Sequence, residues 1–207
     1  MLLSLLKDFE NLFDDTLGDW ATKPVDLELN PDSILFNRRY YPVPRINKEK
    51  IRKYLKHLVD IGVRTPVQKR QYNIPIFIIR KKEGTVMFIS DYHRLNQQLV
   101  RNPYTLPRIG ETMQQLEGFQ YATALDPNMG YYTIRLSPAS QDMTMIGTRF
   151  GKFRYNCLPM GMCASRENFQ TKVDKLLGDI EGVKTYIDDI LVLGKDSFEK
   201  LLRRIAP

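Results

Sequence analysis

The chain has 207 residues, 43% hydrophobic and 27% charged, a composition that excludes an intrinsically disordered protein. Its two cysteines, Cys157 and Cys163, form no CxxC pair, so the sequence lacks a zinc-finger pattern and indicates a reducing compartment. The short apolar opening MLLSLL meets Lys7 and Asp8 at once, and we therefore expect neither a signal peptide nor a membrane span.

The net charge of +7 is spread unevenly. Residues 1–37 carry two basic and eight acidic side chains, whereas residues 38–82, here called the basic segment, carry fourteen basic and two acidic ones. A segment of this charge is typical of a surface that binds a polyanion, because each Lys or Arg near a phosphate releases counterions. The alternative is a solvated basic face on a folded domain.

Hydrophobic spacing predicts an amphipathic helix over residues 2–17 and a short strand at 25–30. A second helix is expected to start after Asn47 as a partial N-cap and to stop near Gly62. Two apolar runs flanking Glu83-Gly84 predict a hairpin over residues 74–89. A short helix is then predicted over residues 106–118.

In the second half, YATALD predicts a strand that ends in Asp126, and YYTIRL (131–136) alternates like a strand. Residues 143–158 predict a hairpin that turns at Gly151-Lys152, followed by a helix over 163–177. Two strands, TYI and ILVL, are expected to flank Asp188-Asp189 as a two-residue link. Strands and helices mix without a regular βαβ alternation, which predicts an α+β fold.

The adjacent carboxylates of Asp188 and Asp189 lie within an apolar segment, VKTYIDDILVLGK. Burying paired like charges is costly unless a cation neutralises them, so the pair either occupies an exposed turn or holds a positive ion. Carboxylate oxygens at a hairpin tip suit Mg²⁺. Two-metal phosphoryl transfer needs a further carboxylate, and Asp126 is the best candidate, although an aspartate at a strand end can also simply start a turn.

Several motifs occur in a fixed order along the chain: SDYHRLN (90–96), YTLPRIGETMQQLEG (104–118), ALDPNMGYYTIRL (124–136), FRYNCLPMGM (153–162), ENFQ (167–170) and TYIDDILV (185–192). Together they resemble the reverse transcriptase of gypsy-like LTR retrotransposons, with retroviral enzymes more distant. The resemblance is collinear from about Pro24 to Lys195.

The resemblance implies a right-hand polymerase arrangement of fingers and palm, with an antiparallel palm sheet packed on helices. The expected ranges are an N-terminal helix and linker (1–23), mainly fingers (24–119), a palm with the catalytic aspartates (120–195) and a truncated tail that stops before the thumb (196–207). Expected activity is RNA-directed DNA polymerisation. The expected partners are an RNA or DNA template with primer and dNTPs, without a membrane, in cytoplasmic virus-like particles or the nucleus.

Site residues carried over from the family are as follows. The catalytic and metal-binding residues are Asp126, Asp188 and Asp189, which would hold two Mg²⁺ ions, with Mn²⁺ possible. The nucleotide-binding residues are Lys81, Tyr131 and Met160, and the primer contact is Tyr186. Asp91 in SDYHRLN matches a common family aspartate that we interpret as structural.

The sequence departs from the family at Val86-Met87, where Trp-Arg is usual, at His93, where Arg is usual, and at Arg166, where Pro is usual. Loss of the arginines at Val86-Met87 and at His93 is expected to weaken nucleotide binding. Two alternatives therefore stay open: a catalytically inactive nucleic-acid-binding remnant that uses the basic segment, and another palm-type nucleotidyl transferase such as an RNA-dependent RNA polymerase. The bulky Tyr131 argues against ribonucleotides.

Overall fold

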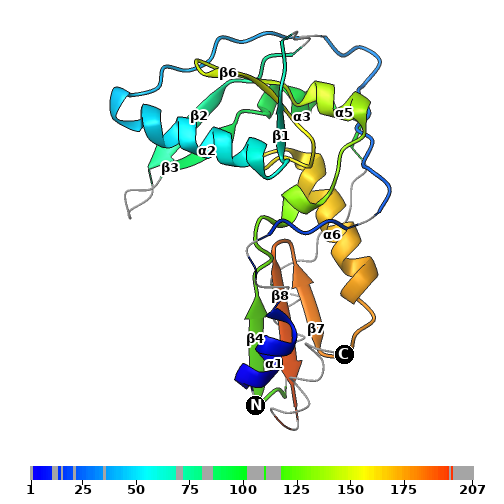
Figure 1. The fold of residues 1–207 in the computed structure, drawn as a ribbon. Coiled ribbons are helices and arrows are strands. Elements are labelled where there is room, and N and C mark those ends of the chain that lie inside the picture. The colour runs from blue at the N-terminus through cyan, green and yellow to red at the C-terminus, as the bar shows by residue number, and fades with distance from the viewer. Residues whose placement is uncertain are drawn as a thin grey trace. The chain divides into compact units, whose positions relative to one another are not determined.

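The structure is a computed structural model that describes residues 2–10, 14, 16–20, 22–34, 36–68, 72–80, 86–101, 110, 118–195 and 197. The chain forms two compact units, each built from segments that are separate in sequence (Figure 1). Unit 1 comprises Met1–Leu17, Pro103–Gly130 and Arg166–Pro207, and unit 2 comprises Gly18–Asn102 and Tyr131–Ser165. The predicted finger and palm ranges are contiguous instead, and their assignment stays a prediction.

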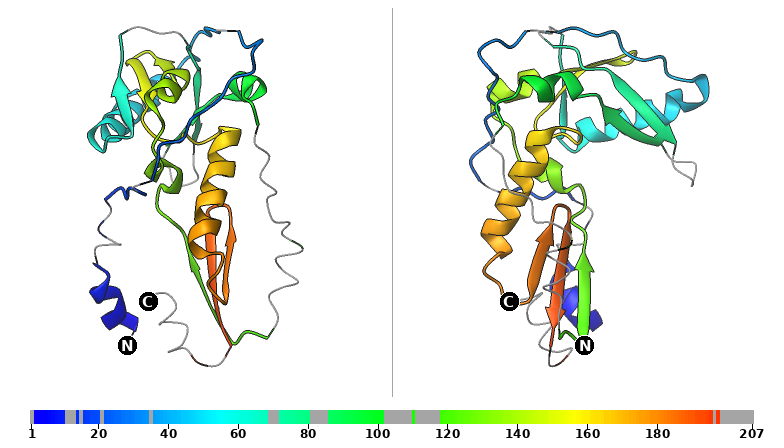
Figure 2. Two further views of the ribbon diagram at one scale, coloured as in Figure 1. Left: turned by 90° about the vertical axis from the view of Figure 1, so that its right-hand side faces the viewer. Right: turned by 180° about the vertical axis from the view of Figure 1, so that it is seen from behind.

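Unit 1 contains a three-stranded antiparallel sheet in the order β4-β8-β7. Its strands are β4 (Tyr121–Leu125), β7 (Val183–Tyr186) and β8 (Asp189–Gly194), and its helices are α1 (Leu2–Asp8) and the greater part of α6 (Cys163–Leu177). Helix α6 runs beside one face of the sheet (Figure 2). Buried Val183 and Val192 form the core on that face, where Leu177 of α6 packs against them.

Unit 2 contains a three-stranded antiparallel sheet in the order β1-β6-β5 and a separate β2-β3 hairpin. The strands are β1 (Arg64–Pro66), β2 (Ile76–Arg80), β3 (Val86–Ser90), β5 (Ile146–Thr148) and β6 (Gly151–Tyr155). The helical elements are η2 (Arg45–Asn47), α2 (Lys48–Asp60), α3 (His93–Gln98), α5 (Pro138–Met143) and η3 (Gly130–Thr133), whose first residue belongs to unit 1.

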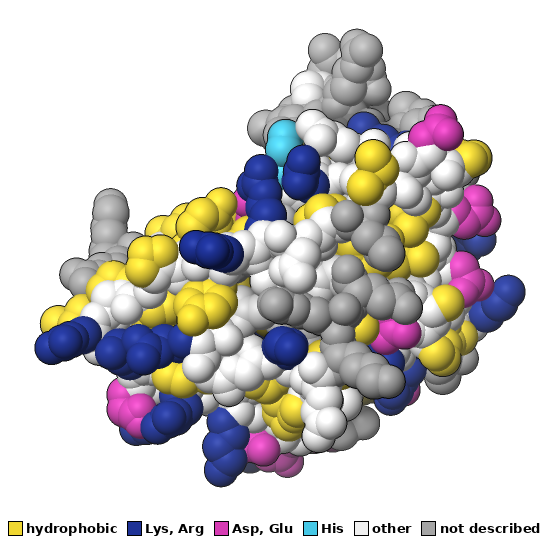
Figure 3. All heavy atoms as spheres, turned by 90° about the horizontal axis from the view of Figure 1, so that it is seen from above, with side chains coloured by type: hydrophobic (Ala, Val, Ile, Leu, Met, Phe, Trp, Pro, Cys, Tyr) yellow, Lys and Arg dark blue, Asp and Glu magenta, His cyan; other side chains and the backbone are white. Residues whose placement is uncertain are grey.

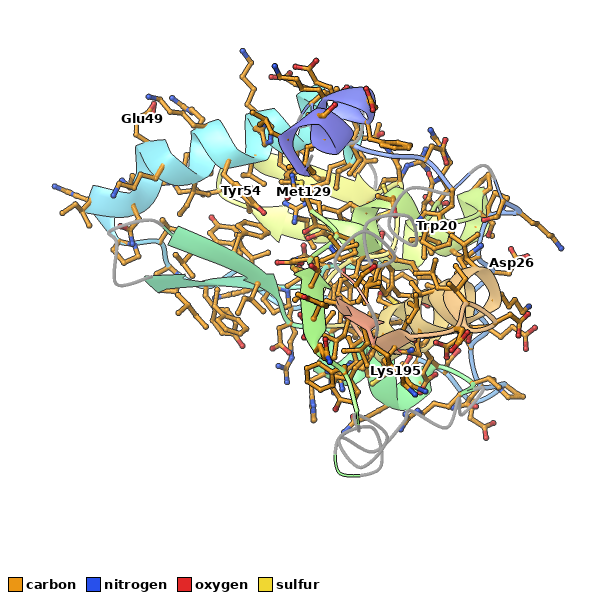
Figure 4. All side chains as sticks on the ribbon, turned by 90° about the horizontal axis from the view of Figure 1, so that it is seen from below. Trp20, Asp26, Glu49, Tyr54, Met129 and Lys195 are labelled. Carbon is orange, nitrogen blue, oxygen red and sulfur yellow. The ribbon has the colours of Figure 1, made fainter. Side chains whose placement is uncertain are left out.

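Helix α2 is amphipathic, and its apolar positions recur at helical spacing. Ile51, Leu55 and Leu58 are almost completely buried. Tyr54 projects from α2 toward β3, where its ring centroid lies 5.9 Å from that of Phe88, whereas Glu49 lies on the outer side of the helix (Figure 4). None of the helices in the described part of the chain has the length and apolarity needed to cross a bilayer.

Most predicted elements are confirmed, among them α2, both strands of the β2-β3 hairpin and β4, with bounds that differ by a few residues. Helix α6 is confirmed with the predicted bounds. The N-terminal helix is confirmed over Leu2–Asp8, and Asn47 stands at the N-cap of α2 without a side-chain capping hydrogen bond. The predicted hairpin tip at Glu83-Gly84 and all of the predicted 106–118 helix except Gly110 and Gly118 lie outside the described residues.

Three expectations about strands are wrong. Residues 131–136 form the end of η3 and isolated bridges rather than a strand, because Leu136 and Arg135 pair singly with Val25 and Cys157. The 25–30 segment likewise forms only isolated bridges. The β5-β6 link is residues 149–150, since the Thr148 hydroxyl accepts from the backbone N–H of Phe150 and donates to the Gly151 carbonyl.

Helices α3 and α5 were not expected from periodicity, because each is only six residues long. Helix α5 nevertheless carries a local start signal. Ser137 accepts a hydrogen bond from the backbone N–H of Ser140, and Pro138 occupies the first helical position, where its missing N–H costs nothing.

Candidate active site

The turn between β7 and β8 carries two of the three predicted carboxylates. Tyr186 pairs with Asp189, so the two-residue link is Ile187-Asp188, and Asp189 is the first residue of β8. The prediction that Asp188-Asp189 forms the link was therefore wrong by one residue. The link lies one residue earlier than predicted because the backbone of Ile187 adopts a left-handed conformation, with φ of 54°, and reverses the chain there.

Asp126 and Asp189 come together at one end of the unit 1 sheet. Leu125 pairs with Ile190, and the antiparallel register places the next residues, Asp126 and Asp189, in one row with Tyr186. Both aspartates are exposed. Because side chains alternate along a strand, Asp189 and Tyr186 project on the face opposite Ile190, which packs with the core beside α6.

Asp188 lies in a different environment from its two neighbours in the site. Its side chain is half-buried, and its Oδ1 atom is buried without a hydrogen-bond partner among the described residues. An orphaned buried carboxylate oxygen is costly unless a cation or a donor compensates it. The donor set, three aspartates with hard oxygen atoms, therefore fits Mg²⁺ or Mn²⁺ chemically.

In the described part of the chain, no three His, Cys, Asp or Glu side chains converge as ligands of a metal ion. The backbone brings Asp126 and Asp189 into one row and adds Asp188 at the adjoining turn, while the side chains stand apart. The sheet register thus explains why the backbone positions of the three aspartates lie next to one another.

Two residues of α6 that sequence reasoning missed support the turns that carry these carboxylates. Gln170 accepts a hydrogen bond from the backbone N–H of Ile187 at 2.6 Å. A Cβ added at Gly130, four residues after Asp126, would lie 2.9 Å from the ring of Phe169. Both α6 residues belong to the quoted ENFQ motif, which was the available signal.

The residues predicted to bind a nucleotide belong to unit 2. Tyr131 is half-buried in η3, and Met160 is 40% exposed in the turn before Gly161. Lys81 lies outside the described residues. Tyr186, the predicted primer contact, is half-buried in β7 of unit 1.

Asn96 of SDYHRLN was not singled out by sequence reasoning, yet it bonds to two backbone groups at the C-terminal end of the LPMGM turn. Its Nδ2 donates to the Gly161 carbonyl at 3.1 Å, and its Oδ1 accepts from the backbone N–H of Cys163 at 3.0 Å. In the same motif, Asp91 accepts from the backbone N–H of His93 and the hydroxyl of Tyr41. These contacts support a structural role for Asp91.

The basic segment is mostly exposed where it is described. Arg38, Arg52, Lys53 and Lys56 have exposed side chains, and Figure 3 shows Lys and Arg side chains lying between hydrophobic ones on one face of the molecule. This arrangement agrees with the predicted polyanion-binding surface.

Arg64 differs from the exposed cations of the basic segment, with only 1% exposure. Its guanidinium lies between the rings of Phe88 and Tyr155, at 4.4 and 4.1 Å from their centroids, and it donates to the Tyr155 hydroxyl. Burial lowers the pKa of Arg64 to about 10. This cation therefore belongs to the core of unit 2.

Comparison with known proteins places these features in a family. Residues 79–206 match the family described as "Reverse transcriptase (RNA-dependent DNA polymerase)". The chain is 27% identical over 206 residues to "Uncharacterized protein K02A2.6" of Caenorhabditis elegans. This alignment covers 97% of the chain and 16% of that protein. The chain is 26% identical to the "Retrovirus-related Pol polyprotein from transposon 412" of Drosophila melanogaster, covering 94% and 18%.

A further relative is the "Transposon Tf2-3 polyprotein" of Schizosaccharomyces pombe, at 26% identity and with 96% of this chain and 15% of that protein covered. The chain thus spans less than a fifth of the length of these three relatives.

Solved structures show the same fold. The native Prototype Foamy Virus Protease-Reverse Transcriptase superposes with a TM-score of 0.90 at 23% identity, over 99% of this chain and 28% of that one. The foamy viral enzyme in complex with an RNA/DNA hybrid gives 0.86 at 21% identity, over 99% and 28%. The predicted α+β polymerase fold is confirmed. Since the family match covers more than half of the sequence, the chain belongs to the reverse transcriptase (RNA-dependent DNA polymerase) family.

Proposed function

We propose that the chain is the fingers and palm portion of an RNA-directed DNA polymerase from a gypsy-like retrotransposon, and that it adds dNTPs to a primer 3′ end. The observation that carries the proposal is the row of Asp126 and Asp189 at one sheet end, next to the orphaned buried oxygen of Asp188. The resemblance to gypsy-like retrotransposon enzymes also leads us to propose that the chain works within cytoplasmic virus-like particles or in the nucleus.

The three aspartates would hold two Mg²⁺ ions, or Mn²⁺ in their place. Such ions, when bound, neutralise phosphate charge and make the primer hydroxyl more acidic. The chain's own contribution is to hold Asp189 at the start of β8, Asp188 in the adjoining turn and Asp126 directly after β4, at one end of the unit 1 sheet. Phosphoryl transfer depends mainly on positioning and charge neutralisation, so no nucleophilic side chain is required.

Lys81, Tyr131 and Met160 are proposed to contact the incoming nucleotide, and Tyr186 the primer end. The proposed partner is a primer paired with an RNA or DNA template. Support comes from the exposed cations of the basic segment and from foamy viral relatives of the same fold in complex with dsDNA and with an RNA/DNA hybrid. Phosphate contacts of this kind make binding strongly dependent on salt.

The test compares Asp188→Asn with Asp179→Asn, which makes the same charge change at an exposed residue beyond α6. Primer extension on an RNA template with dNTPs is expected to fall on the order of 100-fold or more in Asp188→Asn, because a carboxylate that serves the reacting phosphate is lost. Asp179→Asn is expected to behave like the unchanged chain. Mn²⁺ binding, measured by electron paramagnetic resonance, is expected to weaken only in Asp188→Asn.

Retained extension by Asp188→Asn would refute the assigned mechanism. Salt-sensitive binding to a primer–template by the unchanged chain, without extension at any Mg²⁺ or Mn²⁺ concentration, would instead identify a non-catalytic nucleic-acid-binding protein. Equal use of ribonucleotides and deoxyribonucleotides would contradict the role given to Tyr131.

A further inference from the structure

The turn that carries Asp188 begins with a strained residue. Ile187 has φ of 54°, in the left-handed region where its Cβ approaches the following carbonyl oxygen. Glycine and asparagine adopt this region readily, whereas a β-branched residue is an outlier there. Such a conformation persists only where surrounding groups hold it in place.

Gln170 of α6 provides that hold. Its side chain is completely buried, and its Oε1 accepts from the Ile187 N–H at 2.6 Å. Its Nε2 donates to Asp174 Oδ1 at 2.8 Å and to Thr185 Oγ1 at 3.2 Å. The Thr185 hydroxyl in turn donates to the same Asp174 oxygen. The carboxylate of Asp174 therefore determines which end of the Gln170 amide faces the turn.

The neighbouring residue of α6 supports the other carboxylate segment. Phe169 is buried, and its ring lies so close to Gly130 that a Cβ there would come within 2.9 Å. Gly130 closes the turn after Asp126, with its N–H bonded to the Pro127 carbonyl. Two consecutive residues of one helix thus contact both chain segments that present the aspartates.

We propose that Gln170 is a positioning residue for the metal-binding carboxylates: through the Ile187 backbone it sets the place of Asp188 and Asp189 relative to Asp126. Asp174 and Thr185 orient its amide, and Phe169 supports the Asp126 turn from the same helix. The inference rests on the proposed function. It adds a residue that touches neither substrate nor ion and acts through the conformation of a strained turn.

The test uses Gln170→Met in the full 207-residue chain, which keeps an unbranched side chain and removes all three hydrogen bonds. Hydrogen exchange of a peptide covering residues 183–190 is expected to become faster at the Ile187 amide, on the order of tenfold. The Kd for Mn²⁺ is expected to rise on the order of tenfold, as for other residues that orient metal ligands.

Rescue separates positioning from general stability. Ile187→Gly removes the cost of the left-handed backbone, so Gln170→Met is expected to lose less Mn²⁺ affinity in the Ile187→Gly background than alone. An equal loss in both backgrounds, or unchanged exchange at the turn in Gln170→Met, overturns the inference.

A milder pair of variants covers the case in which Gln170→Met does not fold. Thr185→Val removes one contact to Gln170, whereas Thr171→Val makes the same change at an α6 hydroxyl that bonds only locally to the Glu167 carbonyl. Only Thr185→Val is expected to speed exchange at the turn, and equal behaviour of the two refutes the proposal. Measurement of hydrogen exchange needs neither metal nor substrate. If the unchanged chain does not bind Mn²⁺, that result counts against the proposed function and not against the proposal that Gln170 stabilises the turn.

Discussion

The contact between Gly130 and Phe169 gives the sharpest prediction about the candidate site. In Gly130→Ala the new methyl group would lie 2.9 Å from both Cε2 and Cζ of the Phe169 ring. Phe169 is only 1% exposed, so its ring cannot avoid the methyl group by turning out into solvent. Overpacking of this kind destabilises the fold by about 2–3 kcal/mol. Replacing glycine also lowers the backbone entropy of the unfolded chain, which stabilises the fold by roughly 0.5–1 kcal/mol. The free energy of unfolding is therefore expected to fall by about 1–2.5 kcal/mol.

Urea unfolding followed by circular dichroism measures this change. With a slope of about 2–3 kcal/mol per molar urea, the midpoint is expected to fall by about 0.3–1.3 M. Gly18→Ala is the matched control, because its added methyl group would meet only Thr133 Cγ2, at an ordinary 3.8 Å. That variant is expected to keep the midpoint of the unchanged chain or to raise it slightly.

A double variant tests the cause directly. Phe169→Leu removes the ring atoms that the new methyl group would approach, so Gly130→Ala is expected to cost less in the Phe169→Leu background, with a coupling of about 0.5–3 kcal/mol. Additive losses in the two backgrounds would show that the ring contact is not the reason. An unchanged midpoint in Gly130→Ala would refute the close approach itself.

Two further predictions concern buried titratable groups of unit 2. Burial raises the pKa of Cys157 to about 11, so above pH 9 the unfolded chain loses the thiol proton first and stability falls by about 1 kcal/mol between pH 9 and 10. Chemical denaturation across this range is expected to show a fall that is smaller by about 1 kcal/mol in Cys157→Ala, because buried Tyr92 and Tyr132, whose pKa values burial also raises, still contribute. Cys163→Ala is expected to keep the full fall, and an equal fall in Cys157→Ala and the unchanged chain contradicts the assignment. Arg64→Lys, which keeps a buried charge but loses stacking and the bond to Tyr155, is expected to cost roughly 2–4 kcal/mol, more than Arg64→Met. The opposite order in thermal unfolding would show that the aromatic sandwich contributes little.

Local pattern was sufficient for the elements that frame the site. Helix α6 was predicted over its observed bounds because its apolar positions recur at helical spacing, and β4 because a short apolar run ends in Asp126-Pro127. The family motifs made the three aspartates candidates for the same reason, since order and spacing are properties of the chain itself.

Local pattern failed where the partner of a residue is distant in sequence. Residues 131–136 alternate like a strand, but Leu136 and Arg135 find only single partners, at Val25 and Cys157. Arg64 counted as one more surface cation, yet Phe88 and Tyr155 enclose it. Strand propensity and charge are averages over environments, and pairing or enclosure by other segments decides the outcome.

The sequence by itself determined which family the chain resembles and which carboxylates are candidates, because residue order, spacing and hydrophobic period are local. Only the tertiary structure decided where the chain reverses between β7 and β8. Ile187 would not be chosen for a left-handed turn position from its own preferences. It adopts that conformation beside a buried amide of Gln170, seventeen residues earlier, which bonds its N–H. The balance between local strain and a distant hydrogen bond exists only once α6 lies against the sheet.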